Sequence, residues 1–370
     1  MNIIQITPYY PPRVGGLQNV VRMISETLAS RKNKVLVFSS DLDCELEHRV
    51  PSKKDLTINY LGSFEFAHTP IIPNLFSKLM RVPKDSIMHF HISQALIHEI
   101  SAIVCKIKSI PYIAQVHSDL GPSGPLGFLL PLYKKLFLKK VLKGAKKVIV
   151  LNEGYKKLVK EKYGLEKNVV IVPNGVGREF FLNKSIKQIK KANILYVGRL
   201  TVEKNVPKII DSFSKIKNKA VLHIVGDGEL RPIIEEKIRR EKLSSIILYG
   251  FKGGKDLIDL YKKADIFILA SDYEGQPLVL LEAMASGTPI IASDVRGIRE
   301  LAKGIGILMS PPTAESFAKE IDKLIVNKKL RQKMSKLGKE KARQFTWEKV
   351  VDKLEEIYRE ALNEHKNKSH

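Results

Sequence analysis

The sequence predicts an α/β protein with two domains, each built on a doubly wound parallel sheet. Three observations lead to this fold class. The chain has 370 residues, short apolar runs alternate with longer amphipathic segments, and this alternation starts afresh near the middle of the chain. The length favours two domains, since one domain commonly holds about 100–200 residues. Strand-like runs that alternate with helix-like segments are typical of repeated β-α units on a parallel sheet.

The expected strands are the short apolar runs, which are rich in β-branched and aromatic residues. In the first half these runs are 3–6, 35–40, 58–62, 87–92, 112–117, 148–151 and 169–173. In the second half they are 193–198, 220–226, 246–250, 266–271 and 289–293.

These elements divide into an N-terminal domain over 1–182 and a C-terminal domain over 183–346. The polar, Lys-rich stretch 182–192 separates the two series of strands and is the best linker candidate. The final segment, 347–366, has the pattern of one amphipathic helix. When two doubly wound sheets face each other, the loops after their strands meet at a shared central cleft, where ligands bind.

The composition excludes several classes of protein. A hydrophobic content of 44% and a charged content of 28% describe a soluble globular protein. No stretch approaches the roughly 20 apolar residues that span a bilayer, and the chain begins directly with a core strand, so we expect no signal peptide. Cys44 and Cys105 are the only cysteines, too few for a disulfide framework or a Cys-rich zinc site. We therefore expect a cytoplasmic protein.

The net charge of +24 is the unusual bulk property. Such an excess is typical of proteins that meet nucleic acid, an anionic membrane surface or phosphorylated substrates. Lysine and arginine exceed aspartate and glutamate by 12 in residues 1–180 and by 12 in residues 181–370. The charge therefore does not come from one basic tail.

The strongest local signal is the segment 271–293, SDYEGQPLVLLEAMASGTPIIAS. A strand ends at Ser271, and Pro277 stands where the first residue of a helix is expected. Gly287 supplies the C-terminal stop of this helix. Its expected buried face is Leu278, Leu281 and Met284. Because the start of a helix carries N–H groups and a positive dipole end, this segment suits a phosphate group.

Two carboxylates accompany that helix start. Glu274 lies in the loop before it, and Glu282 lies on its second turn, where a carboxylate can accept both hydrogen bonds of a ribose diol. The alternative is that both are solvated carboxylates on an ordinary βα unit, and spacing alone does not separate the two interpretations.

A second signal is the segment 196–205, YVGRLTVEKN. Arg199 and Lys204 flank a strand-end loop, where two cations can neutralise a diphosphate without a metal. The alternative is two surface cations in a Lys-rich protein.

Glycine pairs follow two of the expected strands. Gly15 and Gly16 open a helix after the first strand, where glycine lets the backbone approach a ligand closely. A tight turn is the alternative, and it is the favoured interpretation of Gly226-Asp227-Gly228.

Three histidines belong to expected strands. His117 ends the strand 112–117 and is expected to face the cleft, which makes it a candidate catalytic residue. His89 and His91 alternate along one strand like a pair of metal ligands, but no Cys or acidic third ligand stands at a useful spacing. We therefore expect no metal site.

Taken together, these segments closely resemble the retaining glycosyltransferases of family 4, which have the two-domain arrangement called GT-B. The resemblance runs nearly end to end, from the Gly-Gly loop through GRLTVEKN, VGDGEL and EGQPLVLLEAMASGTPIIAS to FTWEKV. The spacing of Glu274 and Glu282 matches the most specific motif of the family, Glu-x7-Glu.

The resemblance implies donor-binding roles for the matching positions in the C-terminal domain. Arg199 and Lys204 match the pair that holds the donor diphosphate. Glu282 matches the residue that grips the nucleotide ribose, and Glu274 the one near the hydroxyls of the transferred sugar. The loop that contacts phosphate and sugar matches Gly275, Gln276, Pro277 and Leu278.

It also implies roles in the N-terminal domain, on the acceptor side. Gly16, with Gly15 before it, matches the loop that closes on the donor, and His117 matches an active-site histidine beside the sugar. The final helix of this family crosses back to the N-terminal domain, so residues from 347 are expected to pack there. Two departures stand out: Asn205 replaces the usual glycine, and Gln276 stands where an aromatic residue or serine is more common.

The resemblance implies the transfer of a hexosyl group from a UDP- or GDP-sugar to a glycan or lipid-linked acceptor, with retention of anomeric configuration. It implies no cofactor and no metal. The Asp-x-Asp triplet 41–43 follows a strand, but Arg199 and Lys204 already supply the countercharge that a metal ion would bring. A GT-B-shaped nucleotide-sugar epimerase is the alternative, and a basic nucleic-acid-binding protein is a further one, although the chain has no recognisable nucleic-acid-binding module.

An anionic membrane surface is the expected partner of the segment 124–147. No acidic residue occurs from Leu120 to Asn152, and the apolar stretch 124–132 precedes a run of lysines. On a helix, one stripe comprises Lys135, Lys139 and Lys143, and the opposite one comprises Tyr133, Leu136, Phe137, Leu138 and Val141. Each basic residue near an anionic leaflet contributes about 1 kcal/mol. The alternative is that the apolar stripe packs on the sheet and the lysines are solvated.

Overall fold

The computed structural model describes residues 1–67, 69–117, 128 and 130–367. The chain divides into two compact units, the N-terminal unit (Met1–Asn174 with Trp347–His370) and the C-terminal unit (Gly175–Thr346). This division precedes the expected boundary at 182, because the intervening residues bond to the C-terminal unit. The Val176 N–H donates to the Phe345 carbonyl at 2.7 Å, and Lys339 Nζ donates to the Leu182 carbonyl at 2.8 Å.

A seven-stranded parallel sheet forms the centre of the N-terminal unit, in the order β3-β2-β1-β6-β7-β8-β9. Its strands are β1 (Asn2–Ile6), β2 (Lys34–Ser40), β3 (Leu56–Leu61), β6 (Ser86–Ile92), β7 (Tyr112–Val116), β8 (Lys147–Val150) and β9 (Val169–Ile171). A separate antiparallel hairpin joins β4 (Phe64–Phe66) to β5 (Thr69–Ile71). The strand order changes direction between β1 and β6, the position at which doubly wound sheets commonly bind ligands.

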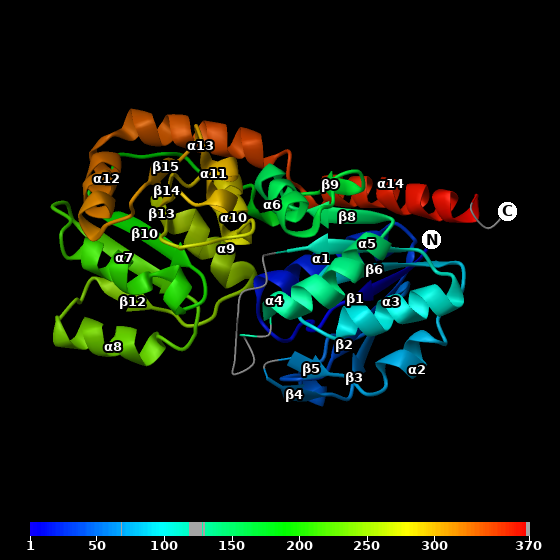
Figure 1. Cartoon of the computed structure of the whole chain (residues 1–370). Helices are drawn as coiled ribbons and strands as arrows, with labels where there is room; N and C mark the ends of the chain where they lie inside the picture. Colours follow the sequence, from blue (N-terminus) through cyan, green and yellow to red (C-terminus); the bar gives the residue numbers. More distant parts are fainter. Residues whose placement is uncertain (68, 118–127, 129, 368–370) are drawn as a thin grey trace. The chain divides into compact units, whose positions relative to one another are not determined.

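Helices and short helical turns connect these strands (Figure 1). They are α1 (Gly16–Ser30), η1 (Leu46–His48), α2 (Leu75–Leu79), α3 (Ile97–Lys108), α4 (Leu130–Tyr133), η3 (Lys134–Leu138), α5 (Lys139–Gly144), α6 (Glu153–Tyr163) and α14 (Trp347–Lys366). The last of these, red in Figure 1, packs against α1 and β7. Its side chains also bond to this unit, since Asn33 Nδ2 donates to Glu355 Oε1 at 2.7 Å.

The basic segment after residue 129 does not have the single apolar stripe that we expected. Its middle, η3, is a turn of π-helix, and such a turn shifts the faces of the helix relative to regular four-residue steps. Leu138 and Val141 are buried in the core, whereas Leu136 and Phe137 are exposed. The expected apolar stripe is therefore wrong as a single face. Residues 118–127 and 129, which include most of the apolar stretch 124–132, lie outside the described residues.

The C-terminal unit has a six-stranded parallel sheet in the order β12-β11-β10-β13-β14-β15. Its strands are β10 (Ala192–Val197), β11 (Ala220–Val225), β12 (Ile246–Leu248), β13 (Ile266–Leu269), β14 (Ile290–Ser293) and β15 (Ile307–Met309). Its helices are η4 (Arg178–Phe180), η5 (Val202–Lys204), α7 (Val206–Phe213), α8 (Arg231–Arg240), α9 (Gly254–Lys263), α10 (Leu278–Ser286), α11 (Arg296–Ala302), α12 (Ala314–Val326) and α13 (Lys328–Ala342). Here the strand order changes direction between β10 and β13.

The predicted fold class, two Rossmann-like domains with doubly wound parallel sheets, is confirmed. The central strands are continuous apolar runs because a parallel sheet with helices on both faces is buried on both faces. In β6 all seven residues are buried, including Ser86, His89 and His91. Polar side chains in such a strand need hydrogen-bond partners inside the protein.

Candidate active site

Two loops meet at the switch point of the C-terminal sheet. One follows β10 and carries Arg199 and Lys204, and the other follows β13 and carries Glu274. Because β10 and β13 are neighbouring parallel strands, both loops leave the same edge of the sheet. The Asp272 N–H donates to the Glu203 carbonyl at 2.9 Å and joins the two loops. The structure therefore brings together two segments that the sequence marked separately.

An ion pair connects the two loops at their centre. Lys204 Nζ lies 2.7 Å from Glu274 Oε1, and the two side chains are only 14% and 12% exposed. Ser271 Oγ also donates to Glu274 Oε1, at 2.8 Å. The sequence pattern predicts both charged residues but not their pairing, since 70 positions separate them.

Asn205 explains how the loop tolerates the loss of the usual glycine. Its backbone has φ 51° and ψ 37°, in the left-handed region, which glycine adopts most readily and asparagine better than most other residues. Its side chain donates to the Ala270 carbonyl at 3.2 Å and to Asp272 Oδ1 at 2.5 Å. The substitution keeps the backbone turn and adds a second connection to the β13 loop.

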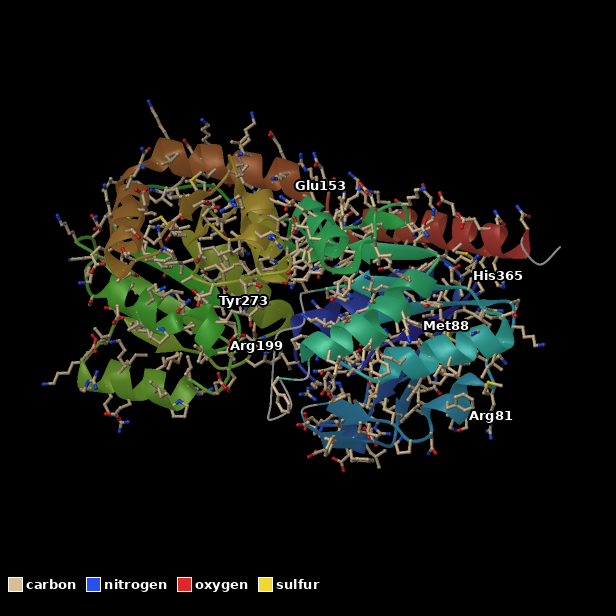
Figure 2. The ribbon with its side chains drawn as sticks, in the orientation of Figure 1. Arg81, Met88, Glu153, Arg199, Tyr273 and His365 are labelled. Atoms are coloured by element: carbon tan, nitrogen blue, oxygen red, sulfur yellow. The ribbon has the colours of Figure 1, made fainter. Side chains whose placement is uncertain are left out.

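Arg199 is the accessible cation of this cluster. Its side chain is 65% exposed, and its guanidinium forms an ion pair with Glu203 Oε1 at 3.1 Å. The Tyr196 hydroxyl donates to the Arg199 carbonyl at 2.9 Å, and this hydrogen bond fixes the backbone of the loop at Arg199. Tyr273, 64% exposed, comes from the β13 loop and is labelled with Arg199 in Figure 2. The sequence pattern alone does not distinguish this exposed aromatic ring from any other loop tyrosine.

The helix that follows the β13 loop differs from the expectation in two respects. Helix α10 begins at Leu278, so Pro277 is its N-cap rather than its first residue, and it ends before Gly287 at φ 71°. It also has no solvent face, because every residue from Leu280 to Ser286 is buried. The expected one-sided burial is wrong because α9, α11, α13, η4 and β14 all contact this helix.

Glu282 is a buried carboxyl on α10, 8% exposed. The Tyr261 hydroxyl, from α9, lies 2.9 Å from Glu282 Oε2 and 3.1 Å from the Val279 carbonyl. Burial raises the pKa of Glu282 to about 7, against the lowering effect of the Tyr261 hydrogen bond. Tyr261 escaped the sequence analysis because it lies in an ordinary amphipathic pattern and only the fold brings it to Glu282.

Gly297 positions the β13 loop and was also missed. A Cβ atom at this residue, in α11, would lie 2.2 Å from the Gly275 carbonyl oxygen and 2.4 Å from that of Glu274. Only glycine allows α11 to approach the loop this closely. Gln276, in the same loop, is buried.

In the N-terminal unit the candidate site residues predicted from the sequence lie in the loops after β1 and β7. Gly16 begins α1, and Gly15 before it has an extended backbone, so neither glycine is required by a left-handed turn. Among the described residues, no atom would lie within 4 Å of a Cβ atom on Gly16.

His117 directly follows β7 and is half-buried. Its Nε2 atom lies 2.9 Å from His91 Nδ1, and burial lowers the pKa of His117 to about 3. The ring is therefore neutral near pH 7. Within the described ranges, no group of three or more His, Cys, Asp or Glu side chains is arranged to hold a metal ion.

Two models of known protein families match this chain, one over most of each unit. Residues 14–180 match the family model "Glycosyltransferase Family 4", and residues 177–341 match the model "Glycosyl transferases group 1". The two matches together run from the Gly-Gly loop to the end of α13.

Two curated relatives illustrate the range of the similarity. The chain is 26% identical to N-acetyl-alpha-D-glucosaminyl L-malate synthase of Bacillus anthracis, over 98% of each chain. It is 28% identical to the UDP-Gal:alpha-D-GlcNAc-diphosphoundecaprenol alpha-1,3-galactosyltransferase of Escherichia coli, over 76% of this chain and 77% of the relative.

The fold is also similar to that of solved structures. One is Anabaena Alr3699/HepE in complex with UDP and glucose, with a TM-score of 0.78 at 18% identity over 96% of this chain and 99% of the other.

A membrane-spanning helix must be both long and apolar, and no helix in the described part of the chain meets both conditions.

Proposed function

This chain belongs to glycosyltransferase family 4, with the GT-B fold, and from that premise we propose that it transfers a hexosyl group from a UDP- or GDP-sugar to an acceptor with retention of anomeric configuration. The observation that carries the proposal is the cluster at the β10/β13 switch point. There an exposed arginine, a lysine–glutamate pair and the start of α10 come from adjacent loops of one sheet.

In this proposal the C-terminal unit binds the donor. Arg199 and Lys204 hold the diphosphate, and an ammonium has three N–H donors, of which the bond to Glu274 uses one. The loop of Gly275, Gln276, Pro277 and Leu278 leads into α10 and contacts phosphate and sugar, because the positive dipole end at the start of a helix favours negative charge.

The carboxylates bind the neutral parts of the donor. Glu282 accepts hydrogen bonds from the ribose, and Glu274, steadied by Ser271 and Lys204, accepts them from the transferred sugar. The N-terminal unit contributes the Gly15–Gly16 loop and His117, and binds the acceptor.

The chemical step needs stabilisation of the departing diphosphate and support for an oxocarbenium-like centre. Arg199, Lys204 and the start of α10 supply positive charge where negative charge develops, which is the main electrostatic contribution to such a reaction. In this proposal no carboxylate acts as a glycosidase-like nucleophile. We propose attack on the same face from which the diphosphate leaves, with a phosphate oxygen accepting the proton of the acceptor.

A thermal-shift screen against nucleotide sugars tests the donor. A ligand at 100 times its dissociation constant stabilises its protein by about 2.7 kcal/mol. We expect a uridine or guanosine diphosphate sugar to raise the melting temperature, as the UDP complex of Alr3699/HepE suggests for a similar fold. Product analysis with and without acceptor then separates transfer from epimerisation, since an epimerase converts the donor when no acceptor is present.

Metal independence is an expected property of this site. In the triplet 41–43, Asp41 accepts hydrogen bonds from the N–H and hydroxyl of Ser63 at 2.9 and 2.8 Å, and Asp43 pairs with Arg13 at 3.1 Å. Both carboxylates thus have partners within the protein. We expect full transfer activity in the presence of a chelator. Loss of activity that magnesium or manganese restores would contradict this prediction.

We further propose that the enzyme works on a lipid-linked acceptor at the cytoplasmic face of a membrane. The name of the Escherichia coli relative states a diphosphoundecaprenol-linked acceptor. On η3 and α5 of this chain, the exposed apolar side chains of Leu136 and Phe137 lie among the exposed lysines Lys135, Lys140 and Lys143. Such a mixture fits the headgroup region of an anionic leaflet.

Vesicle co-sedimentation at low salt measures this docking. We expect more protein to bind anionic than neutral vesicles, and the change of Lys135, Lys139 and Lys143 to Ser to reduce binding because it removes three charges worth about 1 kcal/mol each. The matched control changes Lys328, Lys329 and Lys333 to Ser, three exposed or partly exposed lysines of α13. Equal binding to both vesicle types, or equal loss in both triple variants, would end the proposal.

A further inference from the structure

The N-terminal unit contains a cluster of buried polar side chains behind His117. The alternation of side chains along neighbouring strands brings Gln5 of β1, His89 and His91 of β6 and Gln115 of β7 into it. Tyr358 of α14 closes the cluster. All five are at most 1% exposed.

Hydrogen bonds connect the cluster into one chain. His117 Nε2 lies 2.9 Å from His91 Nδ1, and His91 Nε2 lies 2.6 Å from Gln5 Oε1. Gln5 Nε2 donates to the Tyr358 hydroxyl at 3.4 Å, and that hydroxyl lies 2.8 Å from His89 Nδ1. Each histidine is neutral near pH 7, since burial lowers the pKa of His89 and His117 to about 3 and that of His91 well below its ordinary value.

The Tyr358 end of this hydrogen-bonded chain fixes which group donates in each bond. The Tyr358 hydroxyl has one hydrogen and accepts from Gln5, so it donates to His89 Nδ1. A neutral His89 then carries its proton on Nε2. Among the described residues, this nitrogen and Gln115 Oε1 are both buried without a hydrogen-bond partner, and the interaction of Gln115 with His89 favours a proton on the ring. Donor and acceptor therefore complement each other there.

The same donor and acceptor rules fix the bonds at the His117 end of the hydrogen-bonded chain. Gln5 Oε1 can only accept, so His91 donates from Nε2 and has its lone pair on Nδ1. His117 must then donate from Nε2 to His91. A neutral imidazole has one N–H, so the lone pair of His117 lies on Nδ1.

We propose that this one-way chain, anchored by the Tyr358 hydroxyl on α14, holds His117 as its Nε2–H tautomer, so that His117 offers substrate an acceptor and not a donor. The role of His117 beside substrate rests on the proposed function, whereas its tautomer does not. Tyr358, Gln5 and His91 are positioning residues in this arrangement, and a sugar hydroxyl that donates to Nδ1 is the group that His117 selects. The C-terminal helix thereby takes part in the site as well as in the fold.

Long-range ¹H–¹⁵N NMR of the full chain, labelled with ¹⁵N-histidine, tests the tautomer without any assay of activity. At pH 7 we expect a protonated Nε2 and an unprotonated Nδ1 for His117, His91 and His89. A protonated Nδ1 on His117 would overturn the proposal even if the enzyme proves to be a glycosyltransferase. If the protein shows the expected tautomer but no transfer activity, the proposed function is overturned and the proposed tautomer is not.

Tyr358→Phe tests the anchor. Without the hydroxyl, both orientations of the Gln5 amide leave one end unbonded, so we expect His117 to change from one tautomer to a mixture of two. Tyr112→Phe is the matched control, because it removes a buried hydroxyl that does not belong to the hydrogen-bonded chain. That hydroxyl donates to the Val141 carbonyl at 2.7 Å. Both variants lose stability, but only Tyr358→Phe is expected to shift the ¹⁵N signals of His117. An unchanged single tautomer in Tyr358→Phe would overturn the anchoring role.

Discussion

Arg199→Ala is expected to lower kcat/KM for glycosyl transfer by about 100- to 1,000-fold, the usual effect of removing one preorganised charge-stabilising group. The physical reason is that, in the proposed function, the guanidinium supplies positive charge to a diphosphate whose negative charge grows as the glycosidic bond breaks. The variant should remain folded, because the side chain is 65% exposed and its ion pair with Glu203 is of the exposed kind that contributes about 0–1 kcal/mol.

Arg239→Ala is the matched control for this experiment. Arg239 is also an exposed arginine paired with a glutamate, Glu236, on α8 of the same unit. We expect it to keep full activity. Steady-state kinetics of both variants, with circular dichroism as the check on folding, decide the assignment. Activity near that of the unaltered enzyme in Arg199→Ala would remove Arg199 from the site.

Glu282→Gln is expected to abolish a pH dependence of the stability of the C-terminal unit. The pKa of Glu282 is raised from 4.5 to about 7 in the folded protein, so between these values the folded state binds more protons than the unfolded state. Stability conferred by this group is thus present below pH 4.5 and is lost as the pH rises through 7. The loss amounts to about 3 kcal/mol, at about 1.4 kcal/mol per unit of pKa.

Glutamine does not titrate but still accepts from the Tyr261 hydroxyl. From pH 5 to pH 8 the variant should therefore lose about 2.5 kcal/mol less stability than the parent. The one tryptophan, Trp347, lies in α14 of the N-terminal unit and does not report on this unit. Hydrogen exchange of peptides from α10, compared between variant and parent at each pH, measures the effect. Glu236→Gln, on the exposed face of α8, is the control, and equal pH profiles for parent and Glu282→Gln would refute the prediction.

Glu282→Gln also tests the proposed contact with ribose. An amide presents one acceptor oxygen where a carboxylate presents two, and its NH2 group donates where the second oxygen accepted, so we expect the variant to bind the diol more weakly. Alanine at this position is the less informative substitution, because Glu282 is buried and its removal leaves a cavity and the Tyr261 hydroxyl without this partner.

Periodicity alone located most of the regular elements. Helix α14 spans the expected range 347–366, and strands such as β2, β6 and β10 lie within a residue or two of their predicted limits. The strands that escaped prediction, β4, β5 and β15, have three residues each. Strands β9 and β12 are equally short but were predicted because each lies in a longer apolar run. Pairing with a neighbouring strand, which the local sequence does not contain, decides the other three.

The basic helical segment shows where local pattern misleads. Four-residue spacing suggested one stripe through Phe137 and Val141, yet the π-helical turn at η3 turns the first outward and the second into the core. Such a turn depends on how the flanking helices pack, since the i to i+5 bonding is not favoured locally. The same holds for α10, whose apolar pattern does not reveal that it is buried on every side.

The sequence by itself determined the order of strands and helices and the two-domain organisation of the fold class, because these follow from the periodicity of successive short segments. The candidate donor-binding residues came from the resemblance to a known family, since spacing alone left their alternatives open. Only the tertiary structure decided which of those residues meet. Lys204 and Glu274 pair across 70 residues because β10 and β13 are neighbours, and Tyr358 meets His89 across 269 residues because α14 returns to the first unit. The protonation of Glu282 and the tautomer of His117 follow from burial and from the limited number of hydrogens in a closed network. These are properties of packed neighbours, which no local pattern contains.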